Sequence, residues 1–308
     1  MALTFTPRPA PAEALSCGPL KFIPGRKGGR YPYCHSLVLT GPETWVVDPA
    51  ADKDYFRHLA ATRRVTRVFL SHFHEDHQKY RYLFPEAHFW VPAPEEAAFT
   101  SMAGIFRFMG LIDPRFQEYW RETLLRDFNF RPLTNYSLYF PGDRFHLGDI
   151  TLKIIPAPGH TPGHSCFYFP RQEVLFLADV DLTPFGPWYG DATSSLEDYE
   201  ATLKSLGQRR TSTYLTAHEQ GVFSFEEFQT GLLYFRQVLV DRERRLLSEL
   251  KAPRTLAQLV DRRLIYGKFK EPVFVYEHME RQMLLKHLKL LQRQGLIDCR
   301  AGGHWHQL

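Results

Sequence analysis

Four side chains that suit a metal ion crowd one short stretch of this sequence. His72, His74, Asp76 and His77 fall within six positions, directly after the apolar run at residues 68–70. In an extended backbone the side chains of residues i and i+2 point to the same side, so His72 and His74 can converge on one point. Asp76 and His77 follow where the chain turns away, and they can face a second point nearby. Imidazole and carboxylate groups are ligands of zinc, manganese and iron, so the stretch predicts a transition-metal site.

The competing interpretation of a single HxH pair is a polar turn with solvated histidines. Three histidines and one aspartate in six positions, at the end of a strand of buried type, favour a metal instead. Sulfur ligands are not expected, because the four cysteines are scattered singly and form no CxxC pair. These are Cys17, Cys34, Cys166 and Cys299.

The arrangement of His72, His74, Asp76 and His77 resembles the HxHxDH signature of the metallo-β-lactamase superfamily. The resemblance implies three further ligands downstream, in the order His, Asp, His. Each is present at the exit of an apolar strand: His160 after residues 152–155, Asp179 after 174–178 and His218 after 213–217. Strand ends in an α/β sandwich open onto a shared edge, where residues far apart in sequence can meet.

The resemblance also assigns roles to these residues. It implies that His72, His74 and His160 hold one metal, that Asp76, His77 and His218 hold the other, and that Asp179 bridges the two. The implied cofactors are two divalent ions, zinc first, with manganese or iron as alternatives.

Two further residues are expected to support this centre. By the resemblance, Asp48 at the end of the strand 44–48 lies beneath the metals and orients the histidine loop. The competing interpretation of Asp48 is a turn residue before Pro49. The segment 158–164 resembles the PGHTPGH segment of hydroxyacylglutathione hydrolases, the glyoxalase II enzymes. Within that segment His164 is expected to hydrogen-bond inside its own loop and not to bind metal.

The function implied by the resemblance is metal-dependent hydrolysis. Two cations share a water and lower its pKa from about 15.7 toward 7. The bridging hydroxide then attacks an ester or a thioester, with Asp76 and Asp179 as the catalytic carboxylates. Gln78 and Lys79 stand where the family usually has a small residue and Gly. The substrates of relatives with small pockets are therefore not assumed for this chain.

Three other functions stay open at this point. The first is a phosphodiesterase or ribonuclease of the same fold. The second is a persulfide dioxygenase with one iron, which shares the ligand pattern. The third is a nucleic-acid-binding protein that uses its C-terminal region and has no catalytic role.

The 308 residues, 44% of them hydrophobic, leave room for one large and one small domain. We expect a flexible arm over 1–16 and, from the resemblance, an α/β domain over 17–223 with the αββα metallo-β-lactamase sandwich. A helical insertion of about 92–142 is predicted to contain helices over 95–108 and 115–127. It is either a lid beside the metals or a helical pair that packs on the sandwich or on another subunit.

Residues 224–308 are predicted to form a C-terminal winged-helix-like domain. Three helices over 226–250, 255–266 and 276–294 precede a small hairpin, in an order that resembles the C-terminal module of lactamase-beta-like proteins, an endoribonuclease among them. Basic side chains would line the third of these helices: Arg281, Lys286, Lys289 and Arg293. A nucleic-acid partner is not favoured, because such faces are usually just solvated and the net charge is only +4.

The remaining expectations concern location and partners. The N-terminus lacks the basic and apolar regions of a signal peptide, and no run of eighteen apolar residues occurs. Together with the scattered cysteines, this predicts a cytoplasmic protein without a membrane partner. A small-molecule substrate is expected, and a homodimer stays open.

Overall fold

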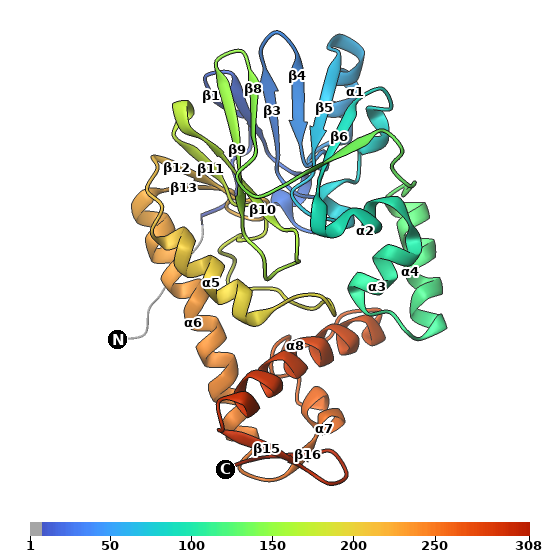
Figure 1. Ribbon diagram of the computed structural model, residues 1–308, viewed down its shortest axis with the longest axis vertical. Helices are drawn as coiled ribbons and strands as arrows, with labels where there is room; N and C mark the ends of the chain where they lie inside the picture. Colours follow the sequence, from blue (N-terminus) through green and yellow to red (C-terminus); the bar gives the residue numbers. More distant parts are fainter. Residues whose placement is uncertain (1–7) are drawn as a thin grey trace.

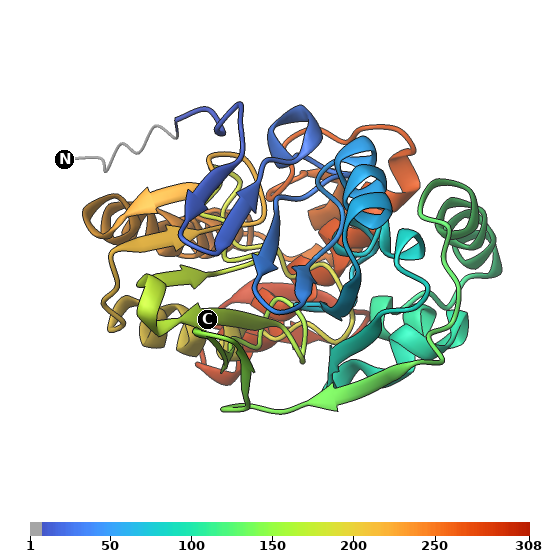
Figure 2. The same ribbon diagram turned by 90° about the horizontal axis from the view of Figure 1, so that it is seen from above.

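The structure, a computed structural model, describes residues 8–308. Two β-sheets face each other, and helices cover the outer face of each (Figure 1). The view from above shows the layers in the order helices, sheet, sheet, helices (Figure 2). The predicted αββα sandwich is therefore confirmed. Residues 1–7 of the predicted N-terminal arm lie outside the described residues.

The first sheet has seven strands in chain order, β1 to β7. Neighbours from β1 to β4 are antiparallel, and those from β4 to β7 are parallel. The strands are β1 Leu15–Cys17, β2 Leu20–Ile23, β3 Ser36–Thr40, β4 Thr44–Val47, β5 Val65–Phe69, β6 His88–Pro92 and β7 Tyr136–Tyr139.

The second sheet has six strands in the order β13-β12-β11-β10-β9-β8. All neighbours are antiparallel except β11 and β12, which are parallel. The strands are β8 Arg144–Leu147, β9 Ile150–Pro156, β10 Ser165–Phe169, β11 Val174–Phe176, β12 Thr213–Leu215 and β13 Val222–Ser224.

The helices on the sandwich begin at side-chain caps. On the first sheet, α1 (Lys53–Thr62) starts after Asp52, whose carboxylate accepts the N–H of Tyr55 at 2.8 Å. On the second sheet, α5 (Leu196–Gly207) is capped by Ser195. The long α6 (Phe225–Glu249) starts at a capping box of Ser224 and Glu227. Such caps satisfy N–H groups that have no partner within the helix.

The core between the sheets is rich in aromatic rings. Phe69, at the end of β5, is fully buried and packs against Phe145 from the other sheet, with ring centroids 4.9 Å apart. The rings of Trp45 and Trp90 flank Phe69 at 5.4 and 6.3 Å. Because the histidine loop follows Phe69 directly, this packing fixes the point at which the loop leaves the sheet.

The insertion contains three helices, where the sequence predicted two. The predicted helix 95–108 divides into α2 (Glu96–Thr100) and α3 (Met102–Met109), and α4 spans Pro114–Asp127. Ser101 is extended and caps α3 by accepting the N–H of Gly104 at 3.0 Å. At Gly104 a Cβ would overlap the carbonyl oxygen of Ala97, so the sharp corner requires glycine.

The C-terminal elements follow the predicted order, with one shorter helix and one strand that was not predicted, β14, which pairs with β16 of the hairpin. They are β14 Arg254–Thr255, α7 Leu256–Asp261, α8 Val273–Arg293, β15 Ile297–Arg300 and β16 His304–Gln307. The helix predicted over 255–266 ends early, and Arg263 then adopts a left-handed φ of 55°. Further along, the buried carboxylate of Glu280 accepts the N–H groups of Ile265 and Tyr266, at 3.0 Å each. The assignment of a winged-helix domain stays a prediction.

Two of the four basic residues predicted to line α8 contact the sandwich. Lys286 is partly buried and donates to the backbone oxygen of Asp191 at 2.6 Å. Arg293 forms an ion pair with Glu197 of α5. Arg281 and Lys289 are exposed without such a contact, and Arg293 stays exposed in its ion pair. Of the four residues, only Lys286 is turned away from solvent.

The insertion also reaches α8. The ring of Phe116 on α4 lies 4.9 Å from that of Phe274, and Tyr119 lies 5.2 Å from the same ring. Figure 1 shows α3 and α4 beside one end of α8. Within residues 8–308, no helix has both the length and the apolar character needed to cross a bilayer.

The first prediction concerns stability. Phe69→Ala should lower the free energy of unfolding by about 3–5 kcal/mol, because it leaves a cavity between the sheets. Urea unfolding followed by tryptophan fluorescence measures this loss. Phe140→Ala, at a ring that is 54% exposed, is the control and should change stability by less than about 0.5 kcal/mol. Equal effects of the two changes would contradict the assigned core.

Candidate metal centre

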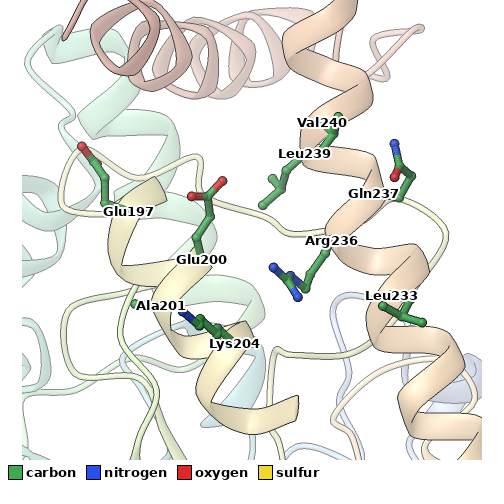
Figure 3. Close-up of a pocket in the computed structure, with 9 residues that line it drawn as sticks. All are labelled: Glu197, Glu200, Ala201, Lys204, Leu233, Arg236, Gln237, Leu239 and Val240. Carbon is green, nitrogen blue, oxygen red and sulfur yellow. The ribbon is translucent and has the colours of Figure 1, made fainter. Parts of the chain in front are cut away.

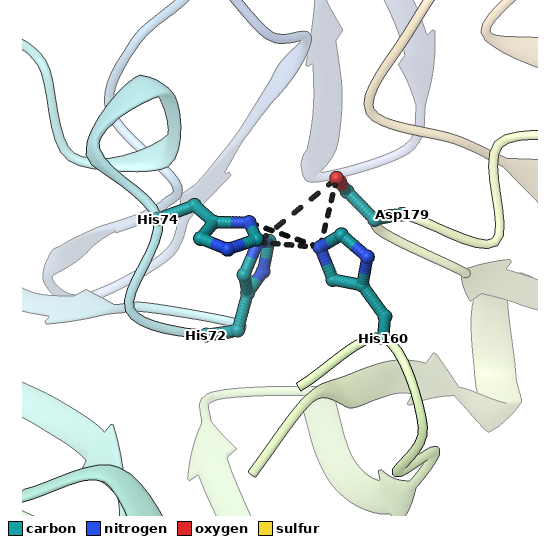
Figure 4. A group of neighbouring side chains, drawn as sticks. All are labelled: His72, His74, His160 and Asp179. Atoms are coloured by element: carbon teal, nitrogen blue, oxygen red, sulfur yellow. Dashed lines mark hydrogen bonds and ion pairs between the residues drawn. The ribbon is translucent and has the colours of Figure 1, made fainter. Parts of the chain in front are cut away.

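The predicted metal ligands lie at one edge of the sandwich, where strands of both sheets end. His72 and His74 follow β5, His160 follows β9, and Asp179 follows β11. Figure 4 shows these four side chains pointing toward a common point from three separate segments. The distances between ligand atoms divide the seven predicted ligands into two groups. We call these the first donor group (His72, His74, His160 and Asp179) and the second donor group (Asp76, His77 and His218).

In the first donor group the ring nitrogens form a small triangle. The Nδ1 atom of His74 lies 3.0 Å from His72 Nε2 and 3.0 Å from His160 Nε2, and the two Nε2 atoms are 3.3 Å apart. Ligands at zinc–nitrogen bonds of about 2.0–2.1 Å in tetrahedral geometry are roughly 3.3 Å apart. The spacing of these nitrogens therefore fits a shared cation.

Asp179 faces both donor groups. Its Oδ2 atom lies 3.3 Å from His160 Nε2 and 3.9 Å from His72 Nε2. Its Oδ1 atom lies 2.8 Å from His77 Nε2 and 3.4 Å from His218 Nε2. The two oxygens of one carboxylate thus point to different groups, which is the arrangement that a bridging ligand requires.

Asp48 holds the ring nitrogens of His72 and His77 that face away from the donor groups, His77 directly and His72 through Ser71. The carboxylate of Asp48 accepts from Ser71 Oγ at 2.6 Å and lies 2.9 Å from His77 Nδ1. Since the Ser71 hydroxyl gives its proton to Asp48, its oxygen accepts from His72 Nδ1 at 3.0 Å. Both imidazoles therefore carry their proton on Nδ1 and turn the Nε2 lone pair inward.

The other three histidines are held in the same way. The acceptors are Asp191 Oδ2 at 2.7 Å for His74 Nε2, the Trp188 carbonyl at 2.9 Å for His160 Nδ1, and the Gly29 carbonyl at 2.5 Å for His218 Nδ1. A carbonyl or carboxylate has no proton to give, so each ring nitrogen is the donor. In the neutral imidazole, the other nitrogen of each of the five rings therefore turns its lone pair to the donor groups, as a metal ligand must.

Two atoms at the centre have no hydrogen-bond partner among the described residues. His77 Nε2 and Asp179 Oδ1 are buried and lie 2.8 Å apart, but without the geometry of a hydrogen bond. Leaving buried polar groups unpaired costs free energy. A divalent cation would satisfy both atoms, so the residues present fit a metal pair.

The protonation of these groups agrees with a role as ligands. Burial lowers the pKa of His72 and of His160 well below the usual value, so both stay neutral. Burial alone would raise the pKa of Asp179, but the surrounding imidazoles, His77 first, hold it well below its usual range. Burial also opposes the charge of His74, yet the nearby Asp191 raises its pKa to about 9. A metal that binds here must displace that proton.

His164 makes two hydrogen bonds of its own. Its Nδ1 donates to the Ala157 carbonyl at 2.9 Å, and its Nε2 accepts the N–H of Asp179 at 3.0 Å. The hydroxyl of Tyr199 donates to the carbonyl of Asp179 at 2.9 Å. Both ring nitrogens of His164 are therefore occupied, and the backbone of Asp179 is fixed from two sides.

Sequence reasoning missed four partners of the predicted ligands. Ser71 stands directly before the motif without a pattern that marks its role, while Gly29, Trp188 and Asp191 lie far from the motif in sequence. Asp191, three residues after the bulky Trp188, carried one usable signal: it is the single charged residue of the aromatic segment 184–191. Nothing in the sequence distinguishes Gly29, which acts through its backbone carbonyl.

A separate hollow of about 520 Å³ lies between α5 and α6 (Figure 3). Its walls carry Glu197 and Glu200 from α5 and Arg236 from α6, with Leu233 and Val240 on the same face of α6. None of the nine residues that line it is a predicted metal ligand, so this hollow is distinct from the metal centre.

Comparison with protein families matches the sequence model of the "Metallo-beta-lactamase superfamily" over residues 33–218, which include all seven predicted ligands. A hydroxyacylglutathione hydrolase from Rhizobium etli is 53% identical over 39 residues, 13% of this chain and 15% of that protein. An atrochrysone carboxyl ACP thioesterase from Paecilomyces divaricatus is 27% identical over 191 residues, 59% of this chain and 48% of that protein. The matched segments thus span half or less of these relatives.

Among solved structures, a metallo-beta-lactamase family protein from Thermus thermophilus has a TM-score of 0.70 at 22% identity, covering 94% of this chain and 99% of that one. A beta-lactamase domain protein from Burkholderia ambifaria has a TM-score of 0.71 at 16% identity, covering 97% and 96%. At these identities the likeness shows the fold alone. Because each match covers 94% or more of this chain, the similarity extends beyond the sandwich into the C-terminal helices.

The second prediction removes the shared carboxylate. Asp179→Ala should lose bound metal and hydrolytic activity, because both donor groups lose a ligand at once. Metal analysis of protein purified with zinc measures the loss, and far-UV circular dichroism should match the wild type. His160→Ala should behave likewise. His58→Ala, on the exposed side of α1, is the control and should retain metal. Turnover that survives Asp179→Ala would contradict the centre.

The third prediction concerns Asp48, whose φ of 48° is left-handed. Asn tolerates this conformation, so Asp48→Asn tests the carboxylate without straining the backbone. Oδ2 of Asp48 accepts from Ser71 Oγ and His77 Nδ1, and Oδ1 accepts the Ser71 N–H at 2.8 Å. An amide NH2 group cannot replace either oxygen as an acceptor, so metal affinity should fall by about 10–100-fold. Competition with a chelator measures it. An unchanged affinity would show that Asp48 is a simple turn residue.

Proposed function

The chain belongs to the metallo-beta-lactamase superfamily, and from this membership we propose that it is a dinuclear metal-dependent hydrolase acting on an ester or a thioester. The observation that carries the proposal is the carboxylate of Asp179, whose two oxygens face two separate sets of histidine nitrogens. The first donor group would hold one divalent cation and the second donor group the other.

Two bound cations would supply Lewis acidity and a water whose pKa is lowered toward about 7. The hydrogen bonds of the chain orient these donors, and burial keeps His72 and His160 neutral and excludes bulk water. The side chains of His72 and His77 are completely buried, while Asp179 and His218 are each 12% exposed. His74 and Asp76 are each 10% exposed, so substrate approaches from the side on which these four side chains reach the surface.

Asp76 is the second carboxylate proposed to act in catalysis. Its Oδ2 atom lies 3.7 Å from His218 Nε2, and its side chain is 10% exposed on the approach side. An acceptor at this place can orient an attacking water by taking a hydrogen bond from it. Asp76 and Asp179 thus both line the region where the scissile bond would lie.

No protein nucleophile is needed, and none of the four cysteines belongs to either donor group. Cys34 and Cys166 are buried. Burial raises the pKa of Cys34 to about 12, so its thiol stays protonated and unreactive. Attack by an activated water is therefore favoured over attack by a side chain.

The preference for a thioester rests on the relatives. The fungal relatives are named as ACP thioesterases, and several bacterial relatives are named as hydroxyacylglutathione hydrolases. These names belong to proteins that match this chain over part of their length. They support a thioester as the first substrate class to test.

The fourth prediction is the outcome of a substrate panel. Zinc-loaded protein should cleave S-acyl thioesters or aryl esters with a higher kcat/KM than bis(p-nitrophenyl) phosphate or RNA. Chelator treatment should abolish the activity, and added zinc or manganese should restore it. Asp179→Ala serves as the background control.

Two results would overturn this assignment. Activity on phosphodiesters alone would favour a nuclease of the same fold. Protein that carries one iron and consumes oxygen in the presence of a persulfide would favour a dioxygenase.

A further inference from the structure

The loop between β11 and α5 contacts two of the predicted ligands. The Trp188 carbonyl accepts from His160 Nδ1 at 2.9 Å, and the Asp191 carboxylate accepts from His74 Nε2 at 2.7 Å. The indole of Trp188 packs against both imidazoles, with ring centroids 5.3 Å from His74 and 5.5 Å from His160. We call residues 184–191 the ligand-support loop. Its position sets the orientation of both histidines.

Arg242 of α6 holds the first half of this loop. Its guanidinium donates to the carbonyls of Phe185 and Pro187, at 2.6 Å each, and to the Tyr189 hydroxyl at 3.0 Å. The guanidinium carbon lies 4.7 Å from the Phe185 ring and 5.4 Å from the Tyr189 ring. Arg242 is only 2% exposed. A buried cation with this many loop partners fixes the loop firmly.

The C-terminal helices hold the loop further along. The Trp188 indole N–H donates to the Tyr266 hydroxyl at 2.8 Å. The Tyr189 hydroxyl lies 2.6 Å from His287 Nε2 on α8. The ring that packs on the histidines is therefore tied to the region between α7 and α8.

Lys286 of α8 holds the end of the loop. Its ammonium donates to the backbone oxygen of Asp191 at 2.6 Å. Burial lowers the pKa of Lys286 to about 8, and the charge of Asp191 opposes that shift. The hydrogen bond from Lys286 fixes the backbone of Asp191, and the carboxylate of Asp191 in turn fixes His74.

The second donor group has different supports. His77 Nδ1 is held by Asp48, and His218 Nδ1 by the Gly29 carbonyl. Neither support belongs to the ligand-support loop or to the C-terminal helices. A change at Asp191 or Lys286 should therefore act on the first donor group alone.

We propose that Asp191 and Lys286 are positioning residues of the metal centre, and that α8 sets the affinity of the first donor group through them. The inference rests on the proposed metal-dependent function. Asp191 keeps the proton on His74 Nε2, so that Nδ1 faces the metal position, and Lys286 keeps Asp191 in reach. The C-terminal helices are then part of the metal centre and not a separable module.

The test is cobalt binding to metal-free protein. Asp191→Asn keeps the shape of the side chain and loses its charge, while Lys286→Met keeps its length and loses the donor. Lys289→Met is the matched control, because Lys289 lies on the exposed side of the same helix. Competition with a chelator gives the affinity of each cobalt equivalent. The visible spectra of His160→Ala and His218→Ala assign each equivalent to its donor group.

Asp191→Asn should weaken the first donor group by about 10–100-fold and leave the second at its wild-type affinity. Lys286→Met should act at the same group, in the same direction and by less, and Lys289→Met should change neither. Thermal unfolding of the metal-free proteins checks that the fold is retained.

Three other results would overturn the proposal. Wild-type affinity at both groups in both variants would overturn the positioning role. Equal losses at both groups would also overturn it, because they would indicate a general structural defect. Failure of the wild-type protein to bind cobalt would overturn the proposed function, and this inference with it.

Discussion

A buried imidazole can offer a lone pair to a cation only while its other ring nitrogen keeps the proton. Five hydrogen bonds enforce this condition here, one for each histidine of the two donor groups. The acceptors come from separate parts of the chain: Ser71, Asp191, Asp48, Trp188 and Gly29. The sheets and the C-terminal helices place these acceptors beside the histidines.

The two sheets provide the rigid part of that support. Strands β5, β9, β11 and β12 end at one edge, and the aromatic packing around Phe69 fixes where the histidine loop begins. Asp48 at the end of β4 then links His77 and, through Ser71, His72. Asp48 and Ser71 follow strands β4 and β5, and Gly29 lies between β2 and β3, so the second donor group and His72 depend mainly on the sandwich.

The C-terminal helices provide the other part. Arg242 of α6 and Lys286 of α8 hold the ligand-support loop. The insertion also contacts α8, through Phe116 and Tyr119. A region that the sequence presented as an independent module thus contacts the metal centre through one loop. This arrangement gives Lys286 and Arg293 of α8 structural contacts that do not require nucleic acid.

Local patterns in the sequence were enough to predict the fold family and the seven candidate ligands, because metal ligands at strand ends follow short motifs with fixed residue types. They also indicated the order of the C-terminal elements, since helix periodicity and turn residues are local signals. The break at Ser101, the early end of α7 and the contacts of Asp191 and Lys286 became visible only in the folded chain. The last two depend on contacts between residues far apart in sequence, and a side chain that acts only through such a contact leaves no pattern in its own neighbourhood.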